Sequence, residues 1–156
     1  MNAKEKEHKA KAVYLGIELS YNKTYVEYFG IAPEDTHLLM INSTKVVKSV
    51  FLESRISNME TNRTIYNVKN IAICSFLNNR LMSKLYSAIY DQFVGNSSIF
   101  KCPIQPGVYY LRNDVRELDV PMFHPPGKFS LTVRIKELKD GPVVLQIFWK
   151  YRVLRI

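Results

Sequence analysis

Apolar and polar residues alternate along most of the chain, and this pattern predicts strands. Val13, Leu15, Ile17 and Leu19 recur at every second position, which is the period of a strand with one buried face. Similar strand-like runs cover residues 24–29, 37–41, 46–56, 64–76 and 108–111. Within residues 64–76 the apolar phase shifts between Val68 and Ile71, which predicts a bulge.

Two further runs near the C-terminus have the most regular alternation. Lys139-Asp140-Gly141 lies between them and predicts a hairpin turn. We expect one face to point inward and to be apolar, with Phe129, Leu131, Val133, Ile135, Leu145, Ile147, Trp149 and Tyr151. The opposite face is basic, with Arg134, Lys136, Lys150 and Arg152. Such a face binds lipid headgroups in some proteins, but it is more often simply solvated.

One segment departs from the strand pattern. Leu81, Leu85, Ile89 and Phe93 are spaced by four residues, which predicts a single amphipathic helix over about residues 80–93. The only two cysteines, Cys74 and Cys102, bracket this segment. They form either one disulfide bridge or two free thiols.

Many short strands separated by turns indicate a mostly-β fold, either a sandwich or a barrel. We expect one domain over residues 12–156, preceded by a disordered tail over residues 1–11. No apolar run is long enough for a membrane-spanning helix.

The residues that usually carry chemistry are scattered. His8, His37 and His124 do not have the spacing of metal ligands. The chain contains no Gly-x-Ser-x-Gly motif and no glycine-rich phosphate loop. We therefore expect no enzymatic activity, no metal and no cofactor. The formal charge of +8 favours anionic partners, but no aromatic-interleaved motif supports nucleic-acid binding.

Signals in the sequence conflict about the cellular compartment of the protein. Asn22, Asn42, Asn62 and Asn96 each begin an Asn-x-Ser/Thr triplet, which is the acceptor for N-glycosylation in secreted proteins. The charged start MNAKEKEHKAKA is not a signal peptide. Residues alone therefore leave both a secreted and a cytosolic protein open.

A set of short motifs in residues 74–151 resembles one known family. The set comprises CSFLNN at 74–79, the helix LMSKLYSAIYDQF, NSSIFKCP at 96–103, GVYYLRN at 107–113 and PPGKFSLTVRI at 125–135. Their order and spacing resemble an arthropod family of secreted proteins in the ML (MD-2-related lipid-recognition) superfamily, near the insect CheB chemosensory proteins. The resemblance implies an extracellular immunoglobulin-like β-sandwich with an apolar pocket between its sheets. It also implies a disulfide between Cys74 and Cys102.

Three hypotheses follow. In the first, a secreted, non-enzymatic carrier holds a lipid or other hydrophobic small molecule, such as a cuticular hydrocarbon or lipid signal in chemosensation. The eight inward residues are then its pocket candidates. In the second, an interaction module with a filled core binds a receptor ectodomain or an anionic membrane through its basic face. In the third, a basic cytosolic or nucleic-acid-binding domain has free thiols.

Overall fold

The computed structural model of the protein describes residues 10–73, 103–120 and 122–155. Strands dominate these ranges. They are β1 (Ala10–Tyr21), β2 (Tyr28–Ala32), β3 (Asp35–Ser43), β4 (Phe51–Asn58), β5 (Thr64–Ala72), β6 (Gly107–Arg112), β7 (Glu117–Val120), β8 (Gly127–Lys136) and β9 (Val143–Arg155). Over the same ranges, no helix is long and apolar enough to span a membrane. The helix expected over about residues 80–93 lies outside the described residues.

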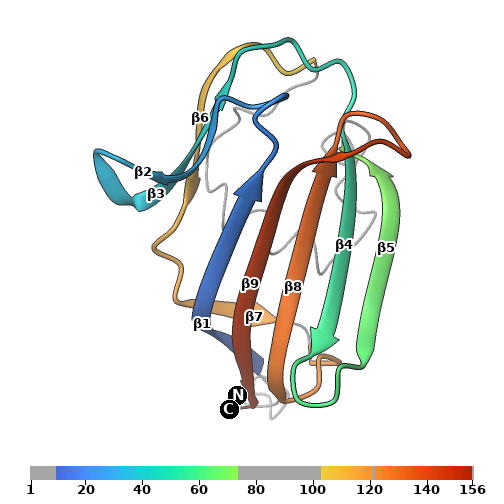
Figure 1. The fold of residues 1–156 in the computed structure, drawn as a ribbon. Coiled ribbons are helices and arrows are strands. Elements are labelled where there is room, and N and C mark those ends of the chain that lie inside the picture. The colour runs from blue at the N-terminus through green and yellow to red at the C-terminus, as the bar shows by residue number, and fades with distance from the viewer. Residues whose placement is uncertain (1–9, 74–102, 121, 156) are drawn as a thin grey trace, which may run out of the picture.

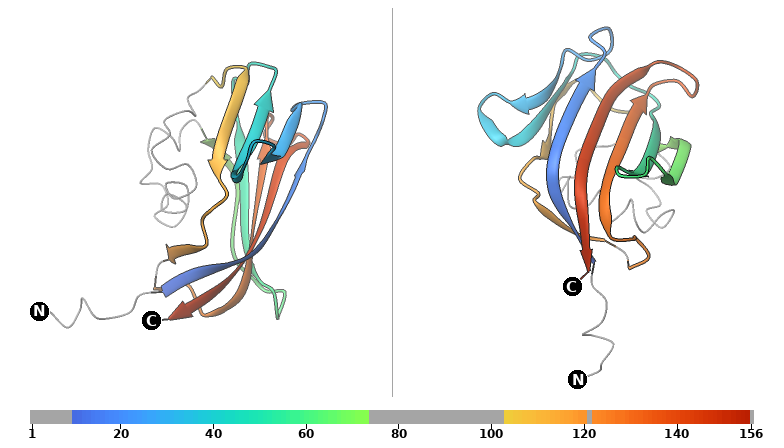
Figure 2. Two further views of the ribbon diagram at one scale, coloured as in Figure 1. Left: turned by 90° about the vertical axis from the view of Figure 1, so that its left-hand side faces the viewer. Right: turned by 60° about the horizontal axis from the view of Figure 1, so that its bottom comes forward.

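The strands form two antiparallel sheets (Figure 1). The larger sheet has the order β5-β4-β8-β9-β1-β7, and the smaller has the order β2-β3-β6. Figure 2 shows the smaller sheet facing one end of the larger, strongly curved sheet. Phe29, Leu39 and Ile41 of the smaller sheet pack in one cluster with Val144 of β9. The expected mostly-β, immunoglobulin-like sandwich of two facing sheets is therefore confirmed.

Far from the smaller sheet, β7 forms an outer strand of the larger sheet alongside the start of β1. β7 pairs with the first residues of β1, so that Leu118 lies opposite Ala12, and Figure 1 shows β7 crossing below β1. We call the resulting buried cluster the packed end. It consists of Ala10, Ala12, Ile56, Val115, Leu118, Phe129, Leu131, Trp149, Tyr151 and Val153.

The first strand differs from its prediction in start and phase. β1 begins at Ala10, which is buried and pairs with Val120, so residues 10 and 11 belong to a strand and not to the predicted tail. Residues 1–9 lie outside the described residues. The pairing of β1 with β9 shifts between Tyr14 and Gly16. This bulge leaves Leu15 exposed and changes which residues face inward, because an extra residue reverses the alternation.

Two other predicted strands start later than expected. Tyr25 N and Val26 N both donate to Asn22 O, at 3.0 and 3.1 Å, so residues 24–27 belong to a turn and β2 begins only at Tyr28. Likewise, β4 begins at Phe51, not at residue 46. The short strand β7 was not predicted, because its four residues carry too little alternation to show a period.

The bulge predicted between Val68 and Ile71 is confirmed. Ser54 pairs with Val68 and Leu52 pairs with Ile71, so β5 has one residue more than β4 over this stretch. Asn70 accommodates the bulge with a φ of 57°, a left-handed conformation that asparagine tolerates better than most residues. The bulge lets Val68 and Ile71 face the same side although they are three residues apart.

Candidate functional site: an apolar cavity between the sheets

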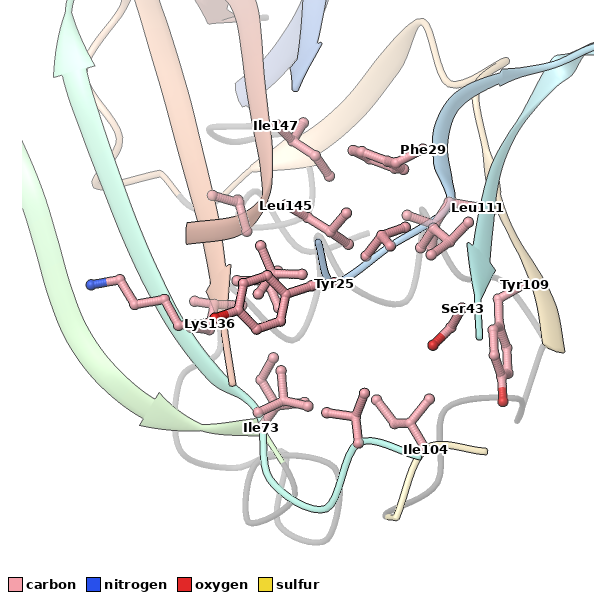
Figure 3. Close-up of a pocket in the computed structure, with 18 of the residues that line it drawn as sticks. Tyr25, Phe29, Ser43, Ile73, Ile104, Tyr109, Leu111, Lys136, Leu145 and Ile147 are labelled. Carbon is pink, nitrogen blue, oxygen red and sulfur yellow. The ribbon is translucent and has the colours of Figure 1, made fainter. Parts of the chain in front are cut away.

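A cavity of about 280 Å³ lies between the two sheets (Figure 3). It is larger than the cavity of roughly 150 Å³ that is known to stay dry and bind benzene in another protein. Its walls come from both sheets and from the loops at the end opposite the packed end. A ligand in this space would therefore be surrounded by side chains from distant parts of the chain.

The wall from the larger sheet follows from strand alternation. β8 contributes Leu131, Val133 and Ile135, and β9 contributes Leu145, Ile147 and Trp149. These side chains lie opposite one another, because Leu131 pairs with Trp149, Val133 with Ile147 and Ile135 with Leu145. Six of the eight residues proposed for the pocket thus line the cavity.

The other two proposed pocket residues, Phe129 and Tyr151, lie elsewhere. They pair with each other, two residues along their strands from the pair of Leu131 and Trp149. Both are buried in the packed end. Alternation places them on the correct face of the sheet. Both belong to one buried cluster with Ala10, Ala12 and Leu118 of β1 and β7, and neither lines the cavity.

The opposite wall comes from the smaller sheet. It includes Leu39, Ile41 and Ser43 of β3, together with Phe29, Tyr109 and Leu111. These residues were not predicted as pocket residues, although the sequence pattern predicts strands over residues 37–41 and 108–111. The alternation of Leu39, Ile41 and Ser43 was the available signal, but it does not reveal which sheet lies across from the strand.

Loops at the rim are held together by hydrogen bonds. Val47 and Ile104 exchange both backbone bonds at 2.8 Å, and Ser49 Oγ donates to Glu137 O at 3.3 Å. Figure 3 shows Ile73 and Ile104 turned toward the cavity from these loops, with the Tyr25 ring also reaching into it. These contacts join loops that come from widely separated parts of the chain.

The cavity has no charged group pointing into it from the described residues. Lys136 and Glu137 are the charged members of its wall. Lys136 Nζ lies 3.2 Å from Glu53 Oε1, and Figure 3 shows this nitrogen directed away from the cavity. The aliphatic stem of the lysine thus covers apolar surface while its charge stays outside.

The four proposed basic surface residues lie on β8 and β9. Arg134 Nε donates to Gln146 Oε1 at 2.9 Å, and Lys136 pairs with Glu53. Lys150 Nζ lies 3.8 Å from Glu18 Oε2. Arg152 is exposed. Two of the four positive charges therefore have a carboxylate nearby, and a docking role for this surface stays a prediction.

The proposed modification sites have different surroundings. Asn22 and Asn62 lie in turns, and Asn62 is exposed with a φ of 60°. Asn42 lies in β3, where it is partly covered. Asn96, Cys74 and Cys102 lie outside the described residues, so their glycosylation and their disulfide stay predictions.

His124 is the most deeply buried titratable group described. Its Nδ1 lies 2.9 Å from Pro125 O, and its Nε2 lies 2.8 Å from the Tyr151 hydroxyl. A carbonyl oxygen only accepts, so Nδ1 carries the proton and Nε2 accepts from Tyr151 in the neutral ring. Burial lowers the pKa of His124, against the opposing effect of the bond to Pro125. This histidine belongs to the packed end and does not reach the cavity.

Metal ligands do not gather in the described part of the chain. No three side chains of His, Cys, Asp or Glu lie close enough together there to hold an ion. The expected lack of a metal, a cofactor and enzymatic activity stays a prediction.

Comparisons with known proteins give a family and distant structural likenesses. Curated proteins include no match to the chain. The crystal structure of a Niemann-Pick type C2 protein from Japanese carpenter ant aligns with a TM-score of 0.41 and 11% identity. The alignment covers 92% of this chain and 91% of that chain, but likeness at this level carries no functional conclusion. A family model described as protein of unknown function (DUF1091) matches residues 47–131. Because this match covers more than half of the sequence, the chain belongs to the DUF1091 family.

Proposed function

We propose that the protein binds a lipid or other hydrophobic small molecule in the cavity between its sheets and holds it without chemical change. The observation that carries this proposal is a cavity of about 280 Å³ whose wall is almost wholly aliphatic and aromatic. Burying each methylene group of a ligand is worth about 0.8 kcal/mol. An apolar ligand therefore needs no charged or metal group for retention.

The rival hypothesis, an interaction module with a filled core and a basic docking face, has weaker support. The cavity argues against a filled core, and Lys136 and Lys150 each have a carboxylate partner. Binding that weakens with added salt and persists when the cavity is blocked would favour this rival.

We further propose that the protein acts outside the cell, with a Cys74–Cys102 disulfide and glycans on exposed triplets. The position of Asn22 and Asn62 in turns supports this setting. The resemblance to the ML superfamily and to the CheB proteins extends the proposal to a chemosensory ligand, presented to a receptor ectodomain. Native mass spectrometry of protein secreted from insect cells should find glycan mass and a retained apolar adduct. Under denaturing conditions, reduction should add the mass of two hydrogen atoms. A bare polypeptide with free thiols would contradict the extracellular setting.

A matched pair of substitutions tests the cavity itself. Leu145→Trp fills the cavity from β9, where Figure 3 shows the leucine pointing into it. Leu154→Trp makes the same exchange on the same strand at a position that is 46% exposed. Titration with the fluorescent probe N-phenyl-1-naphthylamine should show binding to the wild type and to Leu154→Trp. We expect Leu145→Trp to weaken it more than tenfold.

Thermal unfolding of both variants serves as the control for folding, because the indole in Leu145→Trp should occupy space that is already empty. If the two folded variants bind the probe equally, the cavity is not the binding site and the proposed function is wrong.

A further inference from the structure

One hydroxyl in the cavity wall has no partner among the described residues. Ser54 lies on β4 and is 1% exposed, and it lines the cavity between Leu52 and the buried Ile56. Its Oγ is shielded from water and makes no hydrogen bond with the part of the chain that the structure describes. Ser54 is the only residue in this part with such a buried, unpartnered side-chain atom.

This arrangement is costly in a folded protein. A buried hydroxyl without a partner loses about 1–3 kcal/mol of hydration that is not replaced. Alanine at the same place would avoid this loss and would fit the apolar wall. Buried polar groups in native structures are nearly always satisfied, so an exception calls for a specific reason.

A second serine in the wall provides a contrast. Ser43 lies in the opposite wall, and its Oγ donates to Lys45 O at 3.2 Å. That hydroxyl is already used to hold a loop at the rim. Ser54 has only apolar residues opposite it in the two adjacent strands, Val133 on β8 and Val68 on β5.

Ser54 also lies at a definite depth in the cavity. It pairs with Val133, which lies two residues from Leu131 on β8. Leu131 and its partner Trp149 lie between the cavity and the packed end, because they belong to both. Ser54 therefore lies near the floor of the cavity, far from the rim loops. A ligand whose polar group contacts Ser54 would therefore enter the cavity with that group leading.

We propose that Ser54 is a ligand-binding residue and that the ligand is an uncharged amphipathic molecule with a hydroxyl or carbonyl group. This group is bonded to Ser54 Oγ at the floor of the cavity, and the hydrocarbon part of the ligand extends toward the rim. Rotation about χ1 turns the hydroxyl among its staggered positions, so it can meet the ligand. The proposed group is uncharged, because an unpaired buried charge is very unfavourable and the described wall has no charge that faces the floor.

This inference rests on the proposed function, and a double comparison tests it. Octane and 1-octanol are each used to displace N-phenyl-1-naphthylamine from the full chain, as the wild type and as Ser54→Ala. The ratio of the two dissociation constants, octane over 1-octanol, is compared between the proteins. Comparing this ratio between the two proteins cancels the different hydration of octane and 1-octanol. We expect it to be about two- to tenfold higher in the wild type, the range of one net hydrogen bond.

Ser43→Ala is the matched control, because it removes a cavity hydroxyl that already has a partner. Its ratio should equal that of the wild type. Without ligand, Ser54→Ala should unfold at the same or a higher temperature than the wild type, since it loses no hydrogen bond. A marked loss of stability would show that the hydroxyl has a structural partner and would overturn the inference.

The remaining outcomes separate the two proposals. If the ratio of the dissociation constants for octane and 1-octanol is the same in Ser54→Ala as in the wild type, Ser54 is only a small packing residue. The inference is then wrong, and the proposed function stands. If the wild type binds none of N-phenyl-1-naphthylamine, octane and 1-octanol, the proposed function is wrong, and this inference is wrong with it.

Discussion

The two ends of the sandwich are built from the same strands but have opposite interiors. At the packed end the rings of Trp149 and Tyr151 stack 4.9 Å apart, and His124 meets Phe129 edge-on at 4.6 Å. Toward the other end, β8 and β9 present Val133, Ile135 and Leu145 to an open space of about 280 Å³. Both ends show the same alternation of inward and outward residues.

The difference comes from what lies opposite each half of the strands. At the packed end, β7 pairs with β1 and brings Leu118 beside the small side chain of Ala12, where it joins the buried cluster. At the cavity end, the smaller sheet contacts the larger one through Val144 of β9, and an apolar cavity remains between the sheets. A strand pattern therefore identifies an inward face, but the partner element decides whether that face becomes core or cavity. Stability should accordingly depend on one end, and binding on the other.

The largest expected effect is at the packed end. Phe129 is fully buried, so Phe129→Ala should lower the free energy of unfolding by about 3–5 kcal/mol. Urea denaturation followed by the fluorescence of Trp149, the only tryptophan, measures this loss. Phe148→Ala on the outer face of β9 is the control and should cost clearly less. Equal losses would mean that the packed end has no special role.

A matched pair of leucines compares the ends directly. Leu118 is 1% exposed at the packed end, and Leu118→Ala should cost about 2–5 kcal/mol. Leu145 already borders open space, so Leu145→Ala should cost less than about 2 kcal/mol by the same reasoning. Urea denaturation of both variants provides the comparison. A larger loss for Leu145→Ala would show that the cavity end carries the stability.

The smallest expected effect is the pH response of the packed end. Burial lowers the pKa of His124 from its ordinary value of 6.5, so the unfolded chain takes up this proton first as the pH falls. The free energy of unfolding contributed by His124 should be complete above about pH 6.5. It should decline as the pH falls through the lower pKa of the folded state.

Denaturation between neutral and mildly acidic pH measures this decline. His124→Gln should flatten the profile in that window. Probe binding in the cavity is a second readout, because protonation at the packed end should not alter it directly. A profile that is unchanged in His124→Gln would rule out this histidine as the source.

Much of the fold was predictable from local patterns. The bulge between Val68 and Ile71 was visible as a break in alternation, and the hairpin at residues 139–141 followed from its turn residues. Errors arose where tertiary contacts override the pattern. Leu15 looks like an inward residue, but a bulge turns it out. The pairing of β7 with β1 joins distant parts of the chain, so the local pattern does not reveal it.

The candidate site was predictable only on one side. Leu131, Val133 and the other members of the wall from β8 and β9 follow from strict alternation in one hairpin. The facing residues of β3 and β6 required the register between distant strands, such as the pairing of Ile41 with Tyr109. Ser54 gave no signal, because a serine on a strand is ordinary until its surroundings are known.

The bulge at Asn70 has a consequence beyond the cavity. β5 is the outermost described strand on its side of the larger sheet, and an outer strand exposes backbone groups that can pair with another molecule. An irregular strand is a poor template for such pairing, because the extra residue breaks the regular spacing of donors and acceptors. The same asparagine that brings Ile71 toward the cavity thus helps to protect the protein from self-association through its edge.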